Sequence, residues 1–105
     1  MLDVLQLFPT ESNAMEVDAF LAQRLLPLLK ASPGLRALRV SEGTVMSRGG
    51  PSPYSRVVEA SFDGLAAWMG VVDALNAGFA IASPAERESA ERNAPLIMFF
   101  DVVDA

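Results

Sequence analysis

The sequence lacks two residue types that carry much of protein chemistry, since its 105 residues include no cysteine and no histidine. Without cysteine the chain can form no disulfide and offers no thiolate, which fits a reducing compartment. Without histidine it lacks the commonest general base and a leading ligand of transition metals. Catalysis of the Ser-His-Asp type is therefore excluded. We expect no bound metal and no other cofactor.

Basic residues are also scarce: eight lysines and arginines stand against thirteen acidic residues, and the formal net charge is −5. Because no basic run occurs, the chain has no electrostatic footprint for nucleic acid or for an anionic membrane surface. Its apolar runs are far shorter than the ~20 residues that span a bilayer. The first residues, MLDVLQLFP, lack the features of a signal peptide. We expect a cytoplasmic protein without nucleic-acid or membrane partners.

Apolar residues, in contrast, are abundant and make up 51% of the chain. The length is that of one domain, which we place at residues 1–105. A small monomer has much surface and little core. The surplus of apolar residues therefore indicates a surface that another subunit or a ligand covers.

Hydrophobic periodicity predicts four strands and two main helices in the order strand, helix, strand, strand, helix, strand. This βαββαβ order is that of the ferredoxin-like α+β fold, a four-stranded antiparallel sheet with both helices on one face. The segment TVMSRGGPSP predicts a hairpin-type connection, whose part at 47–52 we interpret as a mobile loop and a candidate lid. The strands are expected at residues 2–8, 35–43, 54–62 and 95–104.

Helix boundaries follow from capping signals. The first helix should begin at Asn13, and Pro27 should kink it because proline cannot donate to the carbonyl of the fourth preceding residue. Asp63 should cap the second helix, which Gly78 should end or bend. A shorter helical segment is expected at 83–93, with Ser83 as its N-cap and Glu86 completing a second capping box.

The face of the sheet that the helices leave bare is predicted to be apolar as well. If this face stayed exposed to water, the protein would lose about 25 cal/mol of stabilisation for each Å² of apolar surface that burial would remove from water. The last strand is apolar almost throughout, which is typical of a strand covered on both faces. We therefore expect a homodimer that pairs sheet against sheet. The residues assigned to the bare face are Leu5, Leu7, Ile97, Phe99 and Val103.

Three stretches resemble the EthD-type domain of the dimeric α+β barrel superfamily, and together they span nearly the whole chain. RLLPLLKASPGLRAL is similar to the end of the family's first helix and its Pro-Gly-Leu entry into strand two. YSRVVEASFDGLAAWMGVVDA resembles its third strand and the start of its second helix. SPAERESAERN resembles the Ser-Pro-Glu segment before its last strand.

The resemblance implies a compact homodimer, a dimeric α+β barrel, with a small apolar cavity between sheet and helices. It also implies a role in the breakdown or tailoring of small organic molecules. One position departs from the family. Many relatives carry a histidine two residues before the helix-one proline, where this chain has Leu25. The resemblance therefore supports the fold more than catalysis.

Five residues are candidates for ligand binding. Trp68 lies on the apolar stripe of the second helix and either fills the core or walls a cavity. Arg39 and Arg56 lie inside strands and either pair with neighbouring carboxylates or bind an acidic ligand. Gln6 in mid-strand and Tyr54 at a strand start could orient a ligand in an apolar pocket.

Asp101 is the one carboxylate that we nominate as a catalytic base, because burial between Phe100 and Val102 would raise its pKa. An ion pair at the dimer interface is the alternative role for Asp101.

Three functions are consistent with the sequence. The first is a homodimer that binds a small apolar or aromatic molecule. The second is a cofactor-independent oxygenase, cyclase or isomerase acting on an aromatic or polyketide-like substrate, where the cavity positions and desolvates the substrate. The third is a structural dimerisation module. A pocket that joins Asp101 or Arg39 to Trp68 and Tyr54 would favour catalysis, an apolar pocket would favour binding, and a closed interior would favour the structural role.

Overall fold

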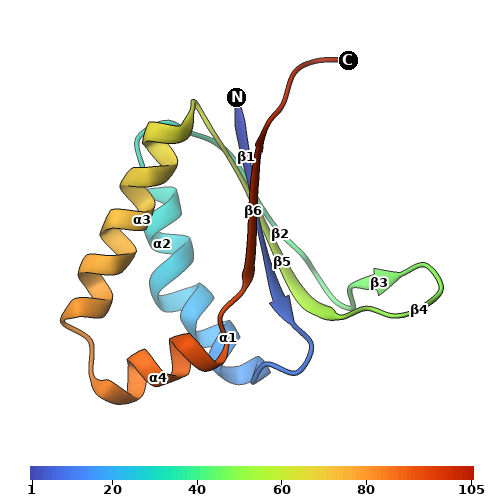
Figure 1. Cartoon of the computed structure of the whole chain (residues 1–105), viewed down its shortest axis with the longest axis vertical. Helices are drawn as coiled ribbons and strands as arrows, with labels where there is room; N and C mark the ends of the chain where they lie inside the picture. Colours follow the sequence, from blue (N-terminus) through green and yellow to red (C-terminus); the bar gives the residue numbers. More distant parts are fainter.

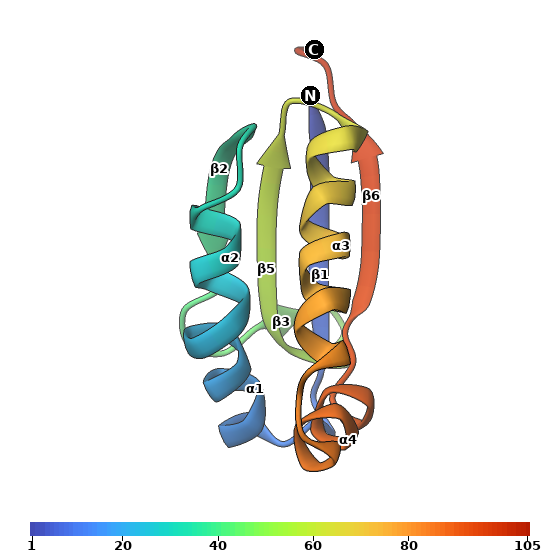
Figure 2. The same ribbon diagram turned by 90° about the vertical axis from the view of Figure 1, so that its left-hand side faces the viewer.

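A computed structural model describes all 105 residues. The main sheet is antiparallel and four-stranded, in the order β2-β5-β1-β6, and the helices lie on one of its faces (Figure 1, Figure 2). The ferredoxin-like βαββαβ class is thus confirmed. The elements are β1 Leu2–Pro9, α1 Ala14–Phe20, η1 Leu21–Leu25, α2 Leu26–Lys30, β2 Leu35–Val40, β3 Met46–Ser47, β4 Gly50–Pro51, β5 Tyr54–Phe62, α3 Leu65–Ala80, α4 Pro84–Arg92 and β6 Leu96–Asp101.

The first helical run begins where its capping box predicts. The Asn13 side chain accepts a hydrogen bond from the backbone N–H of Glu16 at 3.0 Å. The run then continues through α1, the π-helical turn η1 and α2. One stripe of apolar residues, spaced four apart, packs into the core from this run: Val17, Leu21, Leu25 and Leu29.

The irregularity predicted at Pro27 lies one turn earlier. The chain widens into η1, and the N–H of Leu26 donates to the carbonyl of Leu21, five residues back. Pro27 follows directly in the first turn of α2 and has no N–H to donate to the preceding turn. The wider turn accommodates the proline within the continuous helical run.

The prediction that Asp63 caps the second helix is wrong. Gly64 is the N-cap of α3 and contributes no side-chain hydrogen bond. The Asp63 carboxylate instead accepts from the guanidinium of Arg36 on β2. The Asp63 carboxylate is therefore bound to a cation on the neighbouring strand and does not accept a hydrogen bond from the first turn of α3.

Other boundaries shift by a few residues. Helix α3 continues past Gly78 to Ala80, β2 ends at Val40, and β6 is shorter at both ends than predicted. The N-cap of α4 is Ser83, whose hydroxyl accepts from the N–H of Glu86 at 3.2 Å, as its sequence predicts. None of the helices combines the length and apolar character that a bilayer crossing requires.

The strand register assigns each residue to a face. In an antiparallel sheet, paired residues share a face. Val4 is paired with Phe99, and Gln6 with Ile97, so these β6 residues lie on the helix-covered face. The assignment of Ile97 and Phe99 to the bare face is therefore wrong, and Val103 lies beyond the end of β6.

The bare side, which we call the open face, is instead formed on β1 and β6 by the other set of alternating residues. They are Leu5, Leu7, Leu96, Met98 and Phe100. The register was misassigned because both sets in β6 are apolar, and a shift of one residue exchanges the faces. Strand β6 is exposed along its whole length, so this chain's own helices do not provide the predicted cover.

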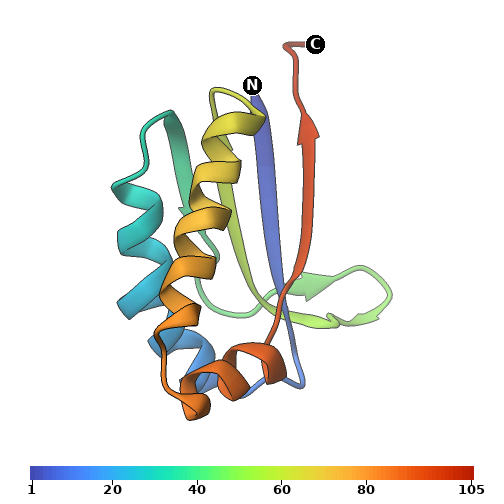
Figure 3. The same cartoon turned by 60° about the vertical axis from the view of Figure 1, so that its left-hand side comes forward.

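The connection after β2 forms the short hairpin β3–β4. It extends from the sheet on the side away from the helices (Figure 1, Figure 3). The hairpin therefore cannot act as a lid over a cavity between sheet and helices. It lies beside the open face instead.

Candidate ligand-binding cavity

A cavity of about 700 Å³ lies between the sheet, the first helical run, α3 and α4. This volume is typical of sites for small organic molecules. Twelve of the twenty-one residues that line it are hydrophobic. Its aromatic walls come from β1, α1 and α3 and are formed by Phe8, Phe20, Trp68 and Phe79.

The aromatic residues form a connected set. The rings of Phe20 and Phe79 are stacked, with centroids 6.1 Å apart, and Phe20 also contacts Phe8 at 6.4 Å. Trp68 is 3% exposed and packs against the core residue Phe62 at 5.8 Å. Both roles considered for Trp68 are thus combined, because the indole belongs to the core and one side of it faces the cavity.

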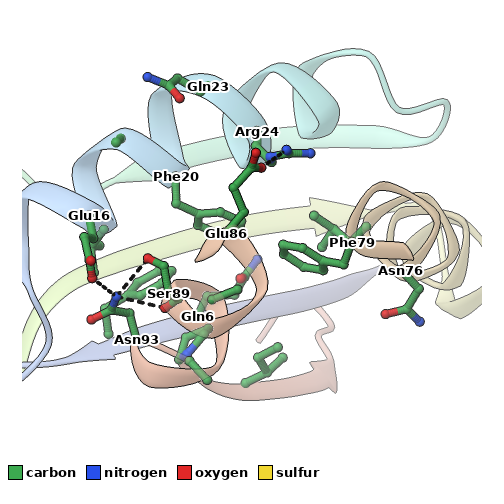
Figure 4. Close-up of a pocket in the computed structure, with 18 of the residues that line it drawn as sticks. Gln6, Glu16, Phe20, Gln23, Arg24, Asn76, Phe79, Glu86, Ser89 and Asn93 are labelled. Atoms are coloured by element: carbon green, nitrogen blue, oxygen red, sulfur yellow. Dashed lines mark hydrogen bonds and ion pairs between the residues drawn. The ribbon is translucent and has the colours of Figure 1, made fainter. Parts of the chain in front are cut away.

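Helix α4 closes one side of the cavity through polar contacts at its C-terminal end. The Asn93 amide donates to the Glu16 carboxylate at 2.6 Å and to the carbonyl of Ser89 at 2.9 Å (Figure 4). Its oxygen accepts from the N–H of Asn13. Arg92 donates to the same carboxylate at 2.7 Å. The hydrogen bond from Asn93 and then that from Arg92 hold the pKa of Glu16 below its usual value.

A second contact holds the other end of α4. The guanidinium of Arg24, on η1, forms an ion pair with the carboxylate of Glu86 at the start of α4 (Figure 4). Both residues line the cavity and are partly exposed, as expected at its rim. The two carboxylates that line the cavity, Glu16 and Glu86, are therefore each bound to an arginine.

Gln6 lies among the residues on the sheet side of the cavity (Figure 4). Its side chain is almost fully buried, and its Nε2 has no hydrogen-bond partner in the chain. The cavity thus combines apolar walls with one free amide at depth and charged residues at its rim.

Of the six residues singled out in the sequence, the structure brings Gln6 and Trp68 together in this cavity. Arg56, although it lies on the helix side of β5, forms an ion pair with Asp18 of α1, at 3.0 Å and 3.3 Å. Tyr54, at the start of β5, does not line the cavity.

Arg39 and Asp101 also lie outside the cavity. Arg39 is exposed on the open face, opposite Glu59 in the register, and Asp101 is exposed at the end of β6. Asp101 therefore lacks the burial on which its nomination as a base depended. Binding roles for Arg39, Tyr54 and Arg56 stay predictions.

The sequence did not indicate that the residues holding α4 against the first helical run would line the cavity. Arg24 and Glu86 are 62 residues apart, and Asn93 and Glu16 are 77 apart, so no local pattern connects them. The available signals were the two capping boxes that marked Glu16 and Glu86, and they indicated only helix starts. Nowhere do three acidic residues lie close enough to hold a metal ion.

Comparison with solved structures shows that the chain has the fold of EthD-type and related α+β proteins. An EthD family protein from Bacillus halodurans C-125 has 16% identity, 98% of this chain and 99% of that chain covered, and a TM-score of 0.64. An EthD-like protein from Ralstonia eutropha JMP134 also has 16% identity and a TM-score of 0.64, and 98% of this chain and 92% of that chain are covered.

A third similar structure is SnoaB, a cofactor-independent oxygenase from Streptomyces nogalater. It has 14% identity and a TM-score of 0.60, and 99% of this chain and 94% of that chain are covered. No family model and no curated protein matches the sequence. The likeness extends over nearly the whole chain, and at these identities it establishes the fold.

Proposed function

We propose that the protein is a homodimer that binds a small, largely apolar organic molecule in the cavity between sheet and helices, within a degradation or tailoring pathway. The observation that carries this proposal is the cavity of about 700 Å³, with aromatic walls and an unpaired amide. Sites for small molecules combine apolar walls with a few polar groups in this way. A structural dimerisation module would not need such a space.

The homodimer would form through the open face. On β1 and β6 this face is apolar apart from Asp3 near one end of β1, whereas on β2 and β5 it carries Arg39, Glu59 and Ser61, the last of which donates to Asp3. An apolar region bordered by polar residues is the usual composition of an interface. A two-fold axis would set the apolar region of one copy against that of the other.

Binding is favoured over catalysis by the state of the acidic groups. A general base needs a free titratable group within reach of the substrate. The carboxylates of Glu16 and Glu86 are each bound to an arginine, and Asp101 lies outside the cavity. The alternative, a cofactor-independent oxygenase, is supported by the shared fold with SnoaB. Positioning and desolvation would then supply its catalysis.

A test uses 2-acetylnaphthalene as the probe, with amide shifts in NMR as the measurement. Ala90 lines the cavity from α4, and Ala66, on the exposed side of α3, does not. The wild type should bind with shifts around the cavity. Ala90→Phe, which fills the space, should weaken binding at least tenfold, whereas Ala66→Phe should bind like the wild type. Unchanged binding by Ala90→Phe, or shifts confined to the open face, would contradict the proposal.

The same protein tests the alternative. Incubation with oxygen and a phenolic naphthalene, 1-naphthol, should leave the compound unchanged if the protein only binds. Accumulation of an oxidised product, absent with Ala90→Phe, would support the oxygenase instead.

A further inference from the structure

Gln6 is an unusual residue for its position. It is paired with Val58 on β5 and with Ile97 on β6, and its inward-facing neighbours along β1 are Val4 and Phe8. An amide thus lies in the middle of an otherwise apolar surface. It is 3% exposed, and its Nε2 is the one buried side-chain polar atom of the protein without a partner.

The other buried polar residues show how this protein normally treats such groups. Ser61 donates to Asp3 at 2.5 Å, and Asn93 satisfies both ends of its amide. A buried donor without a partner destabilises a fold, and native structures contain few of them. A methionine at position 6 would fit the same space without this penalty. The amide therefore requires an explanation beyond packing.

We propose that Gln6 determines ligand specificity by donating an N–H hydrogen bond from Nε2 to the neutral carbonyl oxygen of a flat, apolar ligand. This inference rests on the proposed function and deepens it. Nε2 is enclosed by the chain in the free protein, so the ligand's oxygen reaches it through a rotation of the amide, while the strand already holds the rest of the side chain in place. A ligand of the same shape without the oxygen would leave the amide unpaired.

The charges around the cavity select a neutral acceptor over an anion. The one arginine that lines the cavity, Arg24, is bound to Glu86 at the rim. The second lining carboxylate, Glu16, is paired in the same way with Arg92. A carboxylate ligand would thus lose its hydration and find no cation in the lining that lacks a carboxylate partner. A ketone oxygen loses far less on entering.

The test compares 2-acetylnaphthalene with 2-isopropenylnaphthalene, which has nearly the same shape and carries a CH₂ group in place of the carbonyl oxygen. Wild-type protein should bind the ketone about tenfold more tightly or better. Gln6→Met should bind both probes with equal affinity. Gln23→Met is the matched control, because Gln23 also lines the cavity but is exposed and points away from it (Figure 4). This control should keep the preference for the ketone.

A second measurement separates a ligand-binding role of Gln6 from a structural one. If the amide serves the ligand, Gln6→Met should raise the Tm of the free protein, by about 4 °C or more. A lower Tm would show that Gln6 stabilises the fold and would overturn the inference. Equal binding of both probes by the wild type, at the cavity, would also overturn it while leaving the proposed function intact. Failure of the wild type to bind either probe would refute the proposed function itself.

Discussion

The two faces of the sheet are built from similar residues and have opposite surroundings. On β1, the inward residues Leu2, Val4 and Phe8 are buried, while Leu5 and Leu7, one position away, remain partly exposed. On β6 both sets of residues are apolar and both are exposed. Composition alone thus does not decide which face is covered. The helices decide it, because their apolar stripe packs against one face only.

The helix-covered face differs from the open face in a second respect. The helices cover it over β1 and β5 but do not fill the space beneath them, since a cavity remains between Gln6, Trp68 and α4. A tightly packed interior would contain few voids larger than a water molecule. One face thus offers room for a small molecule, and the other offers an extended surface for a protein.

The largest expected effect tests the open face. Met98→Glu should abolish the proposed dimer, because a two-fold interface would bury two unpaired charges at a cost of several kcal/mol each. Light scattering should give twice the 11.2 kDa of one chain for the wild type and 11.2 kDa for the variant.

The matched control for that experiment is Met15→Glu. Met15 is 84% exposed on α1, and the substitution is chemically the same. It should leave the mass of the wild type unchanged. A monomeric wild type at micromolar concentration would contradict the dimer, as would a dimer that persists in Met98→Glu.

A second, smaller effect contrasts two phenylalanines on opposite faces. Phe62 is fully buried against Trp68, and Phe62→Ala should lower the free energy of unfolding of the protein by about 3–5 kcal/mol. Phe100 lies on the open face, and Phe100→Ala should lower it by about 1 kcal/mol or less in the monomeric Met98→Glu background. Chemical denaturation of both variants measures the difference. Equal losses would mean that the two faces are not packed as differently as described.

The smallest effect concerns pH and the contacts that hold α4 over the cavity. Because folding lowers the pKa of Glu16 from about 4.5, its contribution to stability is fully present above that pH. The contribution is lost as the pH falls through the folded pKa. The stability difference between wild type and Glu16→Gln should therefore shrink between pH 6 and pH 3, as followed by urea unfolding.

Asn93→Ala provides the control for this pH effect, because the hydrogen bond from Asn93 is the largest cause of the lowered pKa. In that background Glu16→Gln should change stability less than it does in the wild type. A difference that grows toward low pH would contradict the assignment.

Local signals predicted the parts of the fold that local contacts determine. The caps at Asn13 and Ser83 were found because each side chain bonds to a backbone N–H three residues on. Asp63 failed as a cap because Arg36, 27 residues away, binds its carboxylate. The same distinction explains the error in β6, where the choice of face depends on pairing with β1 and not on the strand's own pattern.

The candidate site was predicted in part for the same reason. Gln6 and Trp68 were found because each is exceptional within its own element: a polar residue in an apolar strand and an indole on an apolar helix stripe. Arg24 and Glu86 could not be found, because the ion pair between them exists only once α4 has folded back against η1. Strand position alone also placed Arg39 and Tyr54 among the candidates, and neither lines the cavity.

Helix α4 contributes a wall of the cavity and buries none of its own residues. Detaching it would break two ion pairs at the surface and the hydrogen bonds of the buried Asn93, while the twelve-residue core stayed intact. The free energy of such local unfolding lies well below that of global unfolding. For the proposed ligand, a transient departure of this one segment would open the cavity at a rate set by a few polar contacts.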